Sequence, residues 1–214
     1  MKSILHADDH PMIRAGLKIL IEAHVPHVVV DEASDGDSAF EKIKRTLYDM
    51  VILDVSMPGT DSFGLVGNIL ALKPKTKILM FSMHAEDVYA KKYFQLGVKG
   101  YITKEAPVAE IENAISMILS ERKYMSPFLT QLLTEEALGK KTTNNPFDNL
   151  SPREFEIVQH LAKGETVASI SRMLNLHTST IGTFKSRIFE KLNCSNLVAL
   201  NSLAKVNNVL QPSY

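Results

Sequence analysis

Three aspartates in the first 54 residues follow short apolar runs. Asp8 and Asp9 come directly after one such run, and Asp54 comes directly after residues 51–53. Carboxylates that gather in one pocket repel one another, so a cluster of three calls for a divalent cation, and hard oxygen ligands with open positions favour Mg²⁺. Because a carboxylate held beside such a cation can attack a phosphoryl group, the aspartates are candidates for an aspartyl-phosphate site.

Two later residues supply the rest of this chemistry. Ser82 ends an apolar run and offers a hydroxyl, while Lys104 follows a further run and offers a flexible ammonium. Together with the metal, the ammonium would neutralise phosphoryl oxygens while the carboxylate attacks. The spacings are 45 residues from Asp9 to Asp54, 28 from there to Ser82 and 22 from there to Lys104. Taken singly, the aspartates fit a turn or a helix cap, and it is the joint pattern that favours a site.

The elements that would position these residues alternate along the first 120 residues. Strands are expected over Ser3–Ala7, Val28–Ala33, Met50–Val55, Ile78–Ser82 and Gly100–Thr103. Helices are expected between and after them, at about Pro11–Glu22, Asp37–Thr46, Phe63–Lys73, Glu86–Leu96 and Val108–Leu119. Five βα units of this spacing predict an α/β fold, a doubly wound five-stranded parallel sheet covered by helices on both faces. The candidate residues then lie at the carboxyl ends of strands, where chemistry gathers in such sheets.

The pattern changes after residue 121. Residues 122–149 are expected to form a linker with one short helix at about Phe128–Leu138, and residues 150–214 read as a small all-α domain. Ser151 to Glu154 form a capping box with proline at the first helical position, and Gly164 ends that helix. Further helices are expected at about Val167–Leu174, Thr178–Leu192 and Asn196–Asn207. The short connection between the second and third is typical of a helix-turn-helix.

The third helix of this domain separates into two faces by its periodicity. Ile181, Ile188 and Leu192 share a buried stripe. The remaining positions offer hydroxyls that suit phosphates or base edges, and cations that neutralise phosphates. These candidate DNA-binding residues are Ser179, Gly182, Thr183, Lys185, Ser186 and Arg187. The alternative is a three-helix bundle that docks another protein.

Charge and cysteine content limit which partners, cross-links and cellular locations the sequence allows. The chain is neutral, with 24 basic and 24 acidic residues, but residues 1–121 hold 13 basic and 17 acidic side chains and the rest hold 11 and 7. A mildly basic second half suggests a polyanionic partner. The single cysteine, Cys194, excludes an internal disulfide and a cysteine metal cage. Since neither a signal peptide nor a membrane-length apolar stretch is visible, we expect a cytoplasmic protein with no membrane partner.

Histidines give a weaker signal than the aspartates. His6, His10 and His84 show no spacing typical of a histidine metal site. We expect His10 and His84 to line the rim of the aspartate pocket at most.

Residues 1–121 resemble the receiver domain of two-component response regulators. The resemblance rests on Asp8-Asp9, on residues 53–59 (LDVSMPG), on Ser82 and on residues 100–104 (GYITK). It implies a flavodoxin-like fold, with Asp54 as the phosphoacceptor for a sensor histidine kinase. It also implies Mg²⁺ held by Asp8, Asp9, Asp54 and the carbonyl of Ser56, contact of Lys104 with the phosphoryl group, and Ser82 and Tyr101 as a switch pair that turns inward on phosphorylation. Most receivers have proline after the lysine and often a cis bond, whereas this chain has Glu105, which leaves cis or trans open.

Residues 150–207 resemble the LuxR-type helix-turn-helix of the NarL/FixJ subfamily. The resemblance rests on residues 150–156 (LSPREFE), 161–164 (LAKG), Ile170 with Leu174, Thr180-Ile181, and 188–192 (IFEKL). It implies that Glu154 braces the helices, that the third helix enters the major groove of double-stranded promoter DNA, and that two copies pair on the site. Gly182 and Phe184 depart from the family, which usually has a lysine or another polar residue and a histidine or tyrosine there. The apolar face of the last helix (Leu197, Leu200, Leu203, Ala204) is expected to be core on one side and dimer contact on the other.

These resemblances predict a response regulator transcription factor. Phosphorylation of Asp54 would switch formation of a homodimer and promoter binding, and the chain would be no enzyme beyond slow autodephosphorylation of the aspartyl phosphate. One alternative is a phosphorylation-independent regulator that uses the receiver as a dimerisation platform. Another is an aspartate-nucleophile hydrolase, which is disfavoured because such enzymes need an acid two residues after the nucleophile, where this chain has Ser56.

Overall fold

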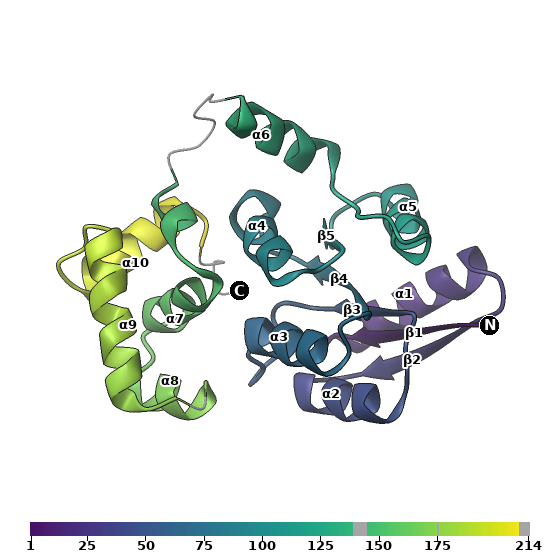
Figure 1. The fold of residues 1–214 in the computed structure, drawn as a ribbon, viewed down its shortest axis with the longest axis horizontal. Helices are drawn as coiled ribbons and strands as arrows, with labels where there is room; N and C mark the ends of the chain where they lie inside the picture. The colour runs from purple at the N-terminus through teal and green to yellow at the C-terminus, as the bar shows by residue number, and fades with distance from the viewer. Residues whose placement is uncertain (139–144, 175, 210–214) are drawn as a thin grey trace. The chain divides into compact units, whose positions relative to one another are not determined.

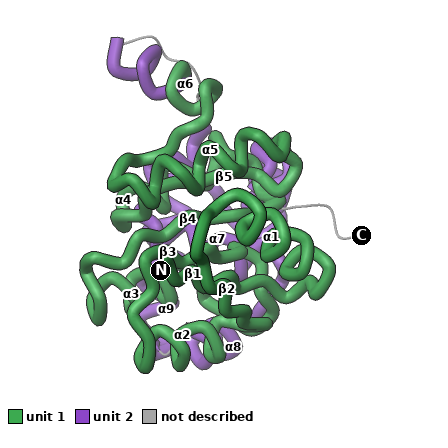
Figure 2. The backbone as a smooth tube through the Cα atoms, turned by 90° about the vertical axis from the view of Figure 1, so that its right-hand side faces the viewer, with its two compact units in different colours: residues 1–131 green, residues 132–214 purple. Residues whose placement is uncertain are grey.

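The computed structural model describes residues 1–138, 145–174 and 176–209. The chain folds into two compact units, residues 1–131 and residues 132–214 (Figure 2). The division falls inside the 122–149 segment, within helix α6 (Pro127–Ala137). Residues 139–144 of the expected linker and the tail from residue 210 lie outside the described residues.

The first unit is a five-stranded sheet in which all neighbouring strands are parallel, in the order β2-β1-β3-β4-β5. Its strands are β1 (Lys2–Ala7), β2 (Val28–Ala33), β3 (Met50–Leu53), β4 (Lys77–Ser82) and β5 (Gly100–Thr103). Its helices are α1 (Pro11–His24), α2 (Gly36–Arg45), α3 (Ser62–Leu72), α4 (Glu86–Leu96) and α5 (Val108–Leu119). Helices α1 and α5 cover one face and α2, α3 and α4 cover the other (Figure 1). The predicted doubly wound sheet is therefore confirmed.

Continuous apolar runs explain why the central strands lie where they do. Every residue of β3 and β4 is buried, as expected for strands covered on both faces. On the α1/α5 side, side chains of the sheet and of the two helices pack into one core that includes Ile4, Ile21, Leu79 and Ile115. Burial of such aliphatic side chains contributes roughly 1.5–3 kcal/mol each to the folded state. This packing fixes the positions of the strands, and the candidate residues lie at the ends of these strands.

The register of the strands places the candidate residues side by side. Ala7 at the end of β1 pairs with Leu53 at the end of β3, and the amide of Asp54 continues this ladder by donating to the carbonyl of Ala7 at 2.9 Å. Ser82 pairs with Thr103, and the amide of Lys104 donates to the carbonyl of Ser82 at 2.8 Å. The aspartates, the serine and the lysine therefore leave the sheet at the same edge.

The second unit consists of short helices. They are the 3₁₀ helix η1 (Pro146–Asn149), α7 (Pro152–Ala162), α8 (Val167–Met173), α9 (Thr178–Lys191) and α10 (Leu197–Val206). The four α-helices agree with the prediction to within two residues at each end, while η1 was not expected. Phe147 of η1 packs edge-on against Phe155 of α7, with ring centroids 6.4 Å apart. Within the described ranges no helix has the length and apolar character needed to cross a membrane.

The capping box at the start of α7 forms as the sequence predicts. The Ser151 hydroxyl accepts from the amide of Glu154, and the Glu154 carboxylate accepts from the amide of Ser151. Glu154 also lies 2.7 Å from the ammonium of Lys191 in α9, so it joins the two helices. Although burial acts to raise the pKa of Glu154, the hydrogen bonds from Lys191 and Ser151 outweigh it and hold this pKa below its ordinary value.

Candidate functional site

The three aspartates singled out by their spacing lie together in the first unit. Asp8, Asp9, Asp54 and also His10 each offer a ligand atom, and these atoms all lie within 4.8 Å of one another. Asp8 is fully buried and Asp54 is 2% exposed, while the side chain of Asp9 is partly open to solvent. Carboxylate oxygens at this separation fit a divalent cation with oxygen ligands, and Mg²⁺ in particular.

Lys104 reaches into the same pocket from the end of β5. Its ammonium lies 2.7 Å from Asp8 Oδ2 and 2.9 Å from Asp54 Oδ2, and its side chain is 4% exposed. Burial raises the pKa of the Asp54 carboxyl, and the neighbouring ammonium offsets only part of this effect. The other Asp54 oxygen accepts from the amide of Ser56 at 3.2 Å. Asp54 is thus a buried carboxyl with a cation on one side and the loop after β3 on the other.

Ser82 and Tyr101, the residues expected to form a switch pair, both contact His84. The Ser82 hydroxyl accepts from the amide of His84 at 3.1 Å, and the Tyr101 hydroxyl donates to the carbonyl of His84 at 3.0 Å. The Tyr101 ring is fully buried, so it already points inward. Its burial raises the pKa of its hydroxyl well above the ordinary value, which keeps the group protonated and able to donate.

His10 and His84 lie beside the pocket, as expected from the sequence. His10 Nδ1 lies 2.8 Å from Asp9 Oδ1 and 3.2 Å from Asp8 Oδ1. His84 Nε2 lies 2.6 Å from the Ser56 hydroxyl, and the His84 ring stacks on Tyr89 with centroids 4.4 Å apart. Through this contact the loop after β4 touches the loop after β3. His10 directly follows Asp9, whereas the contact of His84 with Ser56 could not be predicted from a sequence pattern because it depends on how two loops meet in space.

Two further observations concern residues beside the pocket. His6 is fully buried, and burial lowers its pKa to about 4, so the imidazole is neutral at pH 7. The Lys104–Glu105 bond, which the sequence left open, is trans, as the described residues contain no cis peptide bond.

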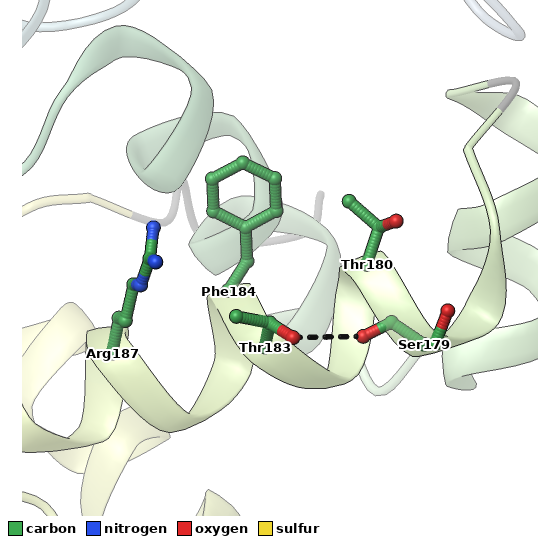
Figure 3. Close-up of a pocket in the computed structure, with 5 residues that line it drawn as sticks. All are labelled: Ser179, Thr180, Thr183, Phe184 and Arg187. Atoms are coloured by element: carbon green, nitrogen blue, oxygen red, sulfur yellow. Dashed lines mark hydrogen bonds between the residues drawn. The ribbon is translucent and has the colours of Figure 1, made fainter.

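The second set of candidates lies along α9. Ile181 and Ile188 are buried, as the predicted stripe requires, and Leu192 beyond the helix end is buried as well. Thr183, Ser186 and Arg187 are exposed. Side chains of one flank line a pocket shown in Figure 3: Ser179, Thr180, Thr183, Phe184 and Arg187.

The polar side chains of α9 are partly engaged by the helix itself. The hydroxyl of Thr183 donates to the carbonyl of Ser179 at 3.1 Å (Figure 3), and that of Ser186 donates to the carbonyl of Gly182 at 3.2 Å. Both hydroxyls keep lone pairs that accept hydrogen bonds. A Cβ at Gly182 would meet nothing within 4 Å, so the glycine leaves an open gap on this surface rather than fitting a close contact. The Lys185 ammonium lies over the Phe189 ring, 5.5 Å from its centroid.

Comparison with known families places both units. Residues 4–116 match the family "Response regulator receiver domain", and residues 148–204 match "Bacterial regulatory proteins, luxR family". The chain is a response regulator of the NarL/FixJ subfamily. As a response regulator of this kind, it is a transcription factor with a receiver domain and a LuxR-type DNA-binding domain. Receiver domains generally bind Mg²⁺ at an acidic pocket, and this response regulator has a cluster of aspartates.

Relatives match this response regulator over nearly all of its length. It is 33% identical to "Response regulator UvrY" of Escherichia coli K12 over 204 residues, which cover 95% of this chain and 94% of the relative. It is 32% identical to "Response regulator GacA" of Pseudomonas syringae pv. syringae over 213 residues, which cover 100% of both.

A solved structure shares the fold of this response regulator. RcsB from Salmonella enterica serovar Typhimurium, solved bound to promoter rprA in the presence of phosphomimetic BeF₃⁻, matches with a TM-score of 0.75 and 23% identity. The match covers 96% of this chain and 99% of that one.

Proposed function

We propose that Asp54 accepts a phosphoryl group from a sensor histidine kinase and that phosphorylation switches dimerisation and promoter binding. The observation that carries this proposal is the position of the Asp54 carboxylate, 2.9 Å from the Lys104 ammonium and beside two further aspartates. A lone buried carboxylate beside a lysine would be an ion pair. Two carboxylates paired with one ammonium, with a third aspartate beside them, leave negative charge that a cation can neutralise, and this is the arrangement that phosphoryl transfer needs.

Each side chain of the pocket has its own role in the transfer of the phosphoryl group. An Asp54 oxygen attacks the phosphorus of the kinase phosphohistidine, the new P–O bond forms as the P–N bond breaks, and the imidazole leaves. The Lys104 ammonium pairs with a phosphoryl oxygen. Asp8, Asp9, Asp54 and the Ser56 carbonyl would hold Mg²⁺, which supplies further neutralisation of the phosphoryl charge. Slow hydrolysis of the same acyl phosphate by water would be the autodephosphorylation that resets the switch.

The contacts of Ser82 and Tyr101 suggest how the change spreads. A phosphoryl oxygen that draws the Ser82 hydroxyl towards itself competes with the hydrogen bond from the His84 amide. The carbonyl of His84 also accepts a hydrogen bond from the Tyr101 hydroxyl, so both switch residues contact the same loop. Phosphorylation thereby biases two arrangements of this loop by its different contacts in each.

The second unit is the proposed DNA-binding domain. Helix α9 would enter the major groove, with Ser179, Gly182, Thr183 and Ser186 near base edges or phosphates, and Lys185 and Arg187 neutralising phosphates. Leu197, Val198 and Val206 of α10 are exposed apolar residues, 40%, 76% and 81% respectively, which suits pairing of two copies. Dimers on promoter DNA are also consistent with the solved RcsB complexes, which share this fold.

One observation favours the alternative, in which the receiver is a dimerisation platform that needs no phosphorylation. Tyr101 already points inward, and the resemblance implies that position after phosphorylation. Under this alternative, promoter affinity would be the same with and without a phosphoryl mimic.

Replacement of Arg187 by alanine tests the proposed binding of DNA by α9. We expect sequence-selective retention of a promoter fragment by the wild-type chain at physiological salt, and weaker binding by Arg187→Ala. The logarithm of the binding constant should also fall less steeply with that of the salt concentration, by about one unit of slope per protomer, because one phosphate contact is lost. Fluorescence anisotropy at several salt concentrations measures both.

The matched control for this test is Arg45→Ala. It removes an exposed arginine from α2 of the first unit and should leave both affinity and slope unchanged. A chain that retains no promoter fragment above a scrambled duplex would instead be a protein-docking module.

A further inference from the structure

The seven residues between α5 and α6, residues 120–126, return along the edge of the sheet. The amide of Tyr124 donates to the carbonyl of Lys99 at 2.8 Å, and Tyr124 forms an isolated parallel bridge with Gly100 at the start of β5. The Tyr124 ring is 2% exposed and belongs to the core under α5, and its hydroxyl donates to Glu110 in the first turn of α5. This segment is therefore part of the first unit and ends at a fixed place, two residues before Ser126.

Ser126 joins the start of α6 to the start of α4. Its hydroxyl donates to the Glu86 carboxylate at 2.6 Å and accepts from the amide of Leu129 at 3.0 Å. Its carbonyl accepts from the amide of Thr130 at 2.9 Å. One side chain thus caps the first turn of α6 and binds the first residue of α4, and Ser126 itself is only 8% exposed.

The Glu86 carboxylate depends on Ser126 for its hydrogen bonding. Its second oxygen, Oε1, is buried and makes no hydrogen bond. Burial raises the pKa of Glu86, and hydrogen bonds from the hydroxyl and from the backbone of Ser126 oppose this rise. The charges that face Glu86 are Asp87 on its own helix and Glu110 on α5, both of which repel it. Loss of the contact with Ser126 would leave a half-buried carboxylate among like charges, which favours a rearrangement of Glu86 when the contact breaks.

The same loop of the chain touches the phosphorylation pocket. His84, two residues before Glu86, contacts the Ser82 hydroxyl through its amide, the Tyr101 hydroxyl through its carbonyl and the Ser56 hydroxyl through its ring. A shift of His84 is passed on to Glu86 through a single intervening residue, Ala85. Hydrogen bonds weaken steeply when distance or angle departs from the optimum, so a small movement is enough to break the bond to Ser126.

We propose that the Glu86–Ser126 hydrogen bond is a clasp, closed in one state of the phosphorylation pocket and open in the other, that controls the first turn of α6. Helix α6 leads from the first unit into the second. The clasp would therefore connect the phosphorylation pocket to the helix that leads into the DNA-binding unit. The inference rests on the proposed function of Asp54 and adds to it the residues that carry the change out of the receiver.

Exchange of the Leu129 and Thr130 amides with deuterium tests the clasp in the full-length chain. In the wild type, Mg²⁺ with beryllofluoride should raise their exchange rates about 10- to 100-fold, the range for loss of a hydrogen bond to a charged group. In Glu86→Ala the rates should be raised already, and beryllofluoride should add less than about twofold. Both amides donate to Ser126, which in turn binds Glu86, so this effect is the one expected of a connection through Ser126.

The matched control is Asp87→Ala, which also removes one carboxylate from the first turn of α4. It should keep wild-type protection and the wild-type response. Glu86→Gln keeps the shape of the side chain with a weaker acceptor and should fall between wild type and Glu86→Ala, which guards against a variant that simply fails to fold.

The outcomes separate the clasp from the function on which it rests. The ¹⁹F NMR signal of bound beryllofluoride reports the pocket independently of α6. A chain that gives this signal while Leu129 and Thr130 exchange unchanged has a working pocket and no clasp, and equal behaviour of Glu86→Ala and Asp87→Ala has the same meaning. Absence of the bound signal refutes the phosphoacceptor function and the clasp together.

Discussion

Asp54→Asn is expected to lower labelling of the protein by acetyl phosphate in Mg²⁺ by at least about 100-fold, because the substitution removes the nucleophile. An amide is a poor nucleophile towards phosphorus, and Asp8, the other carboxylate paired with Lys104, is fully buried. Intact-mass spectrometry counts the phosphoryl groups added to each chain over time.

The control for this substitution is Asp37→Asn. Asp37 is an exposed carboxylate in the first turn of α2, outside the pocket, and its replacement should leave the labelling rate unchanged. Labelling of Asp54→Asn at the wild-type rate would mean that another residue accepts the phosphoryl group.

Lys104→Met is expected to destabilise the first unit by about 3–5 kcal/mol in the absence of Mg²⁺, as is typical when a buried ion pair loses one partner. Methionine retains much of the lysine stem but leaves the buried carboxylates of Asp8 and Asp54 without their cation. Mg²⁺ at millimolar concentration should restore part of the loss, because an ion that binds only the folded pocket stabilises it.

Denaturant titration followed by tyrosine fluorescence measures this loss in the first unit. The chain has no tryptophan, and five of its six tyrosines lie within residues 1–131. Lys2→Met is the control, because the Lys2–Asp49 pair is on the surface and should contribute only about 0–1 kcal/mol. A loss below about 1 kcal/mol for Lys104→Met, or one that Mg²⁺ leaves unchanged, would contradict an electrostatic role for this lysine in the pocket.

Most of the fold could be predicted because local signals agreed with tertiary ones. The bounds of β2, β5, α4 and α5 are those expected from the sequence, since an apolar run and turn residues mark each of them. Strand β3 ends at Leu53, two residues earlier than expected. The apolar Val55 extends the hydrophobic pattern, but the chain leaves the sheet at Asp54, where the carboxylate turns towards Lys104.

The candidate site was predictable where topology alone brings residues together. Asp8, Asp54 and Lys104 meet because parallel strands end at one edge, and this follows from strand order. The contacts of His84 with Ser56 and of Ser126 with Glu86 could not be predicted, because they join loops 28 and 40 residues apart and depend on side-chain orientation. The inward position of Tyr101 belongs to the same class, since an aromatic residue in a strand is equally consistent with simple core packing.

The most direct measurement is the mass in solution of the full-length chain, by sedimentation, with acetyl phosphate or beryllofluoride in Mg²⁺. We predict a shift from a 23.8 kDa monomer to a dimer, accompanied by tighter promoter binding, and we predict that Asp54→Asn abolishes both changes. A chain that gains no phosphoryl group and keeps its mass would contradict phosphorylation as the switch, and its DNA-binding unit would have to be regulated in another way.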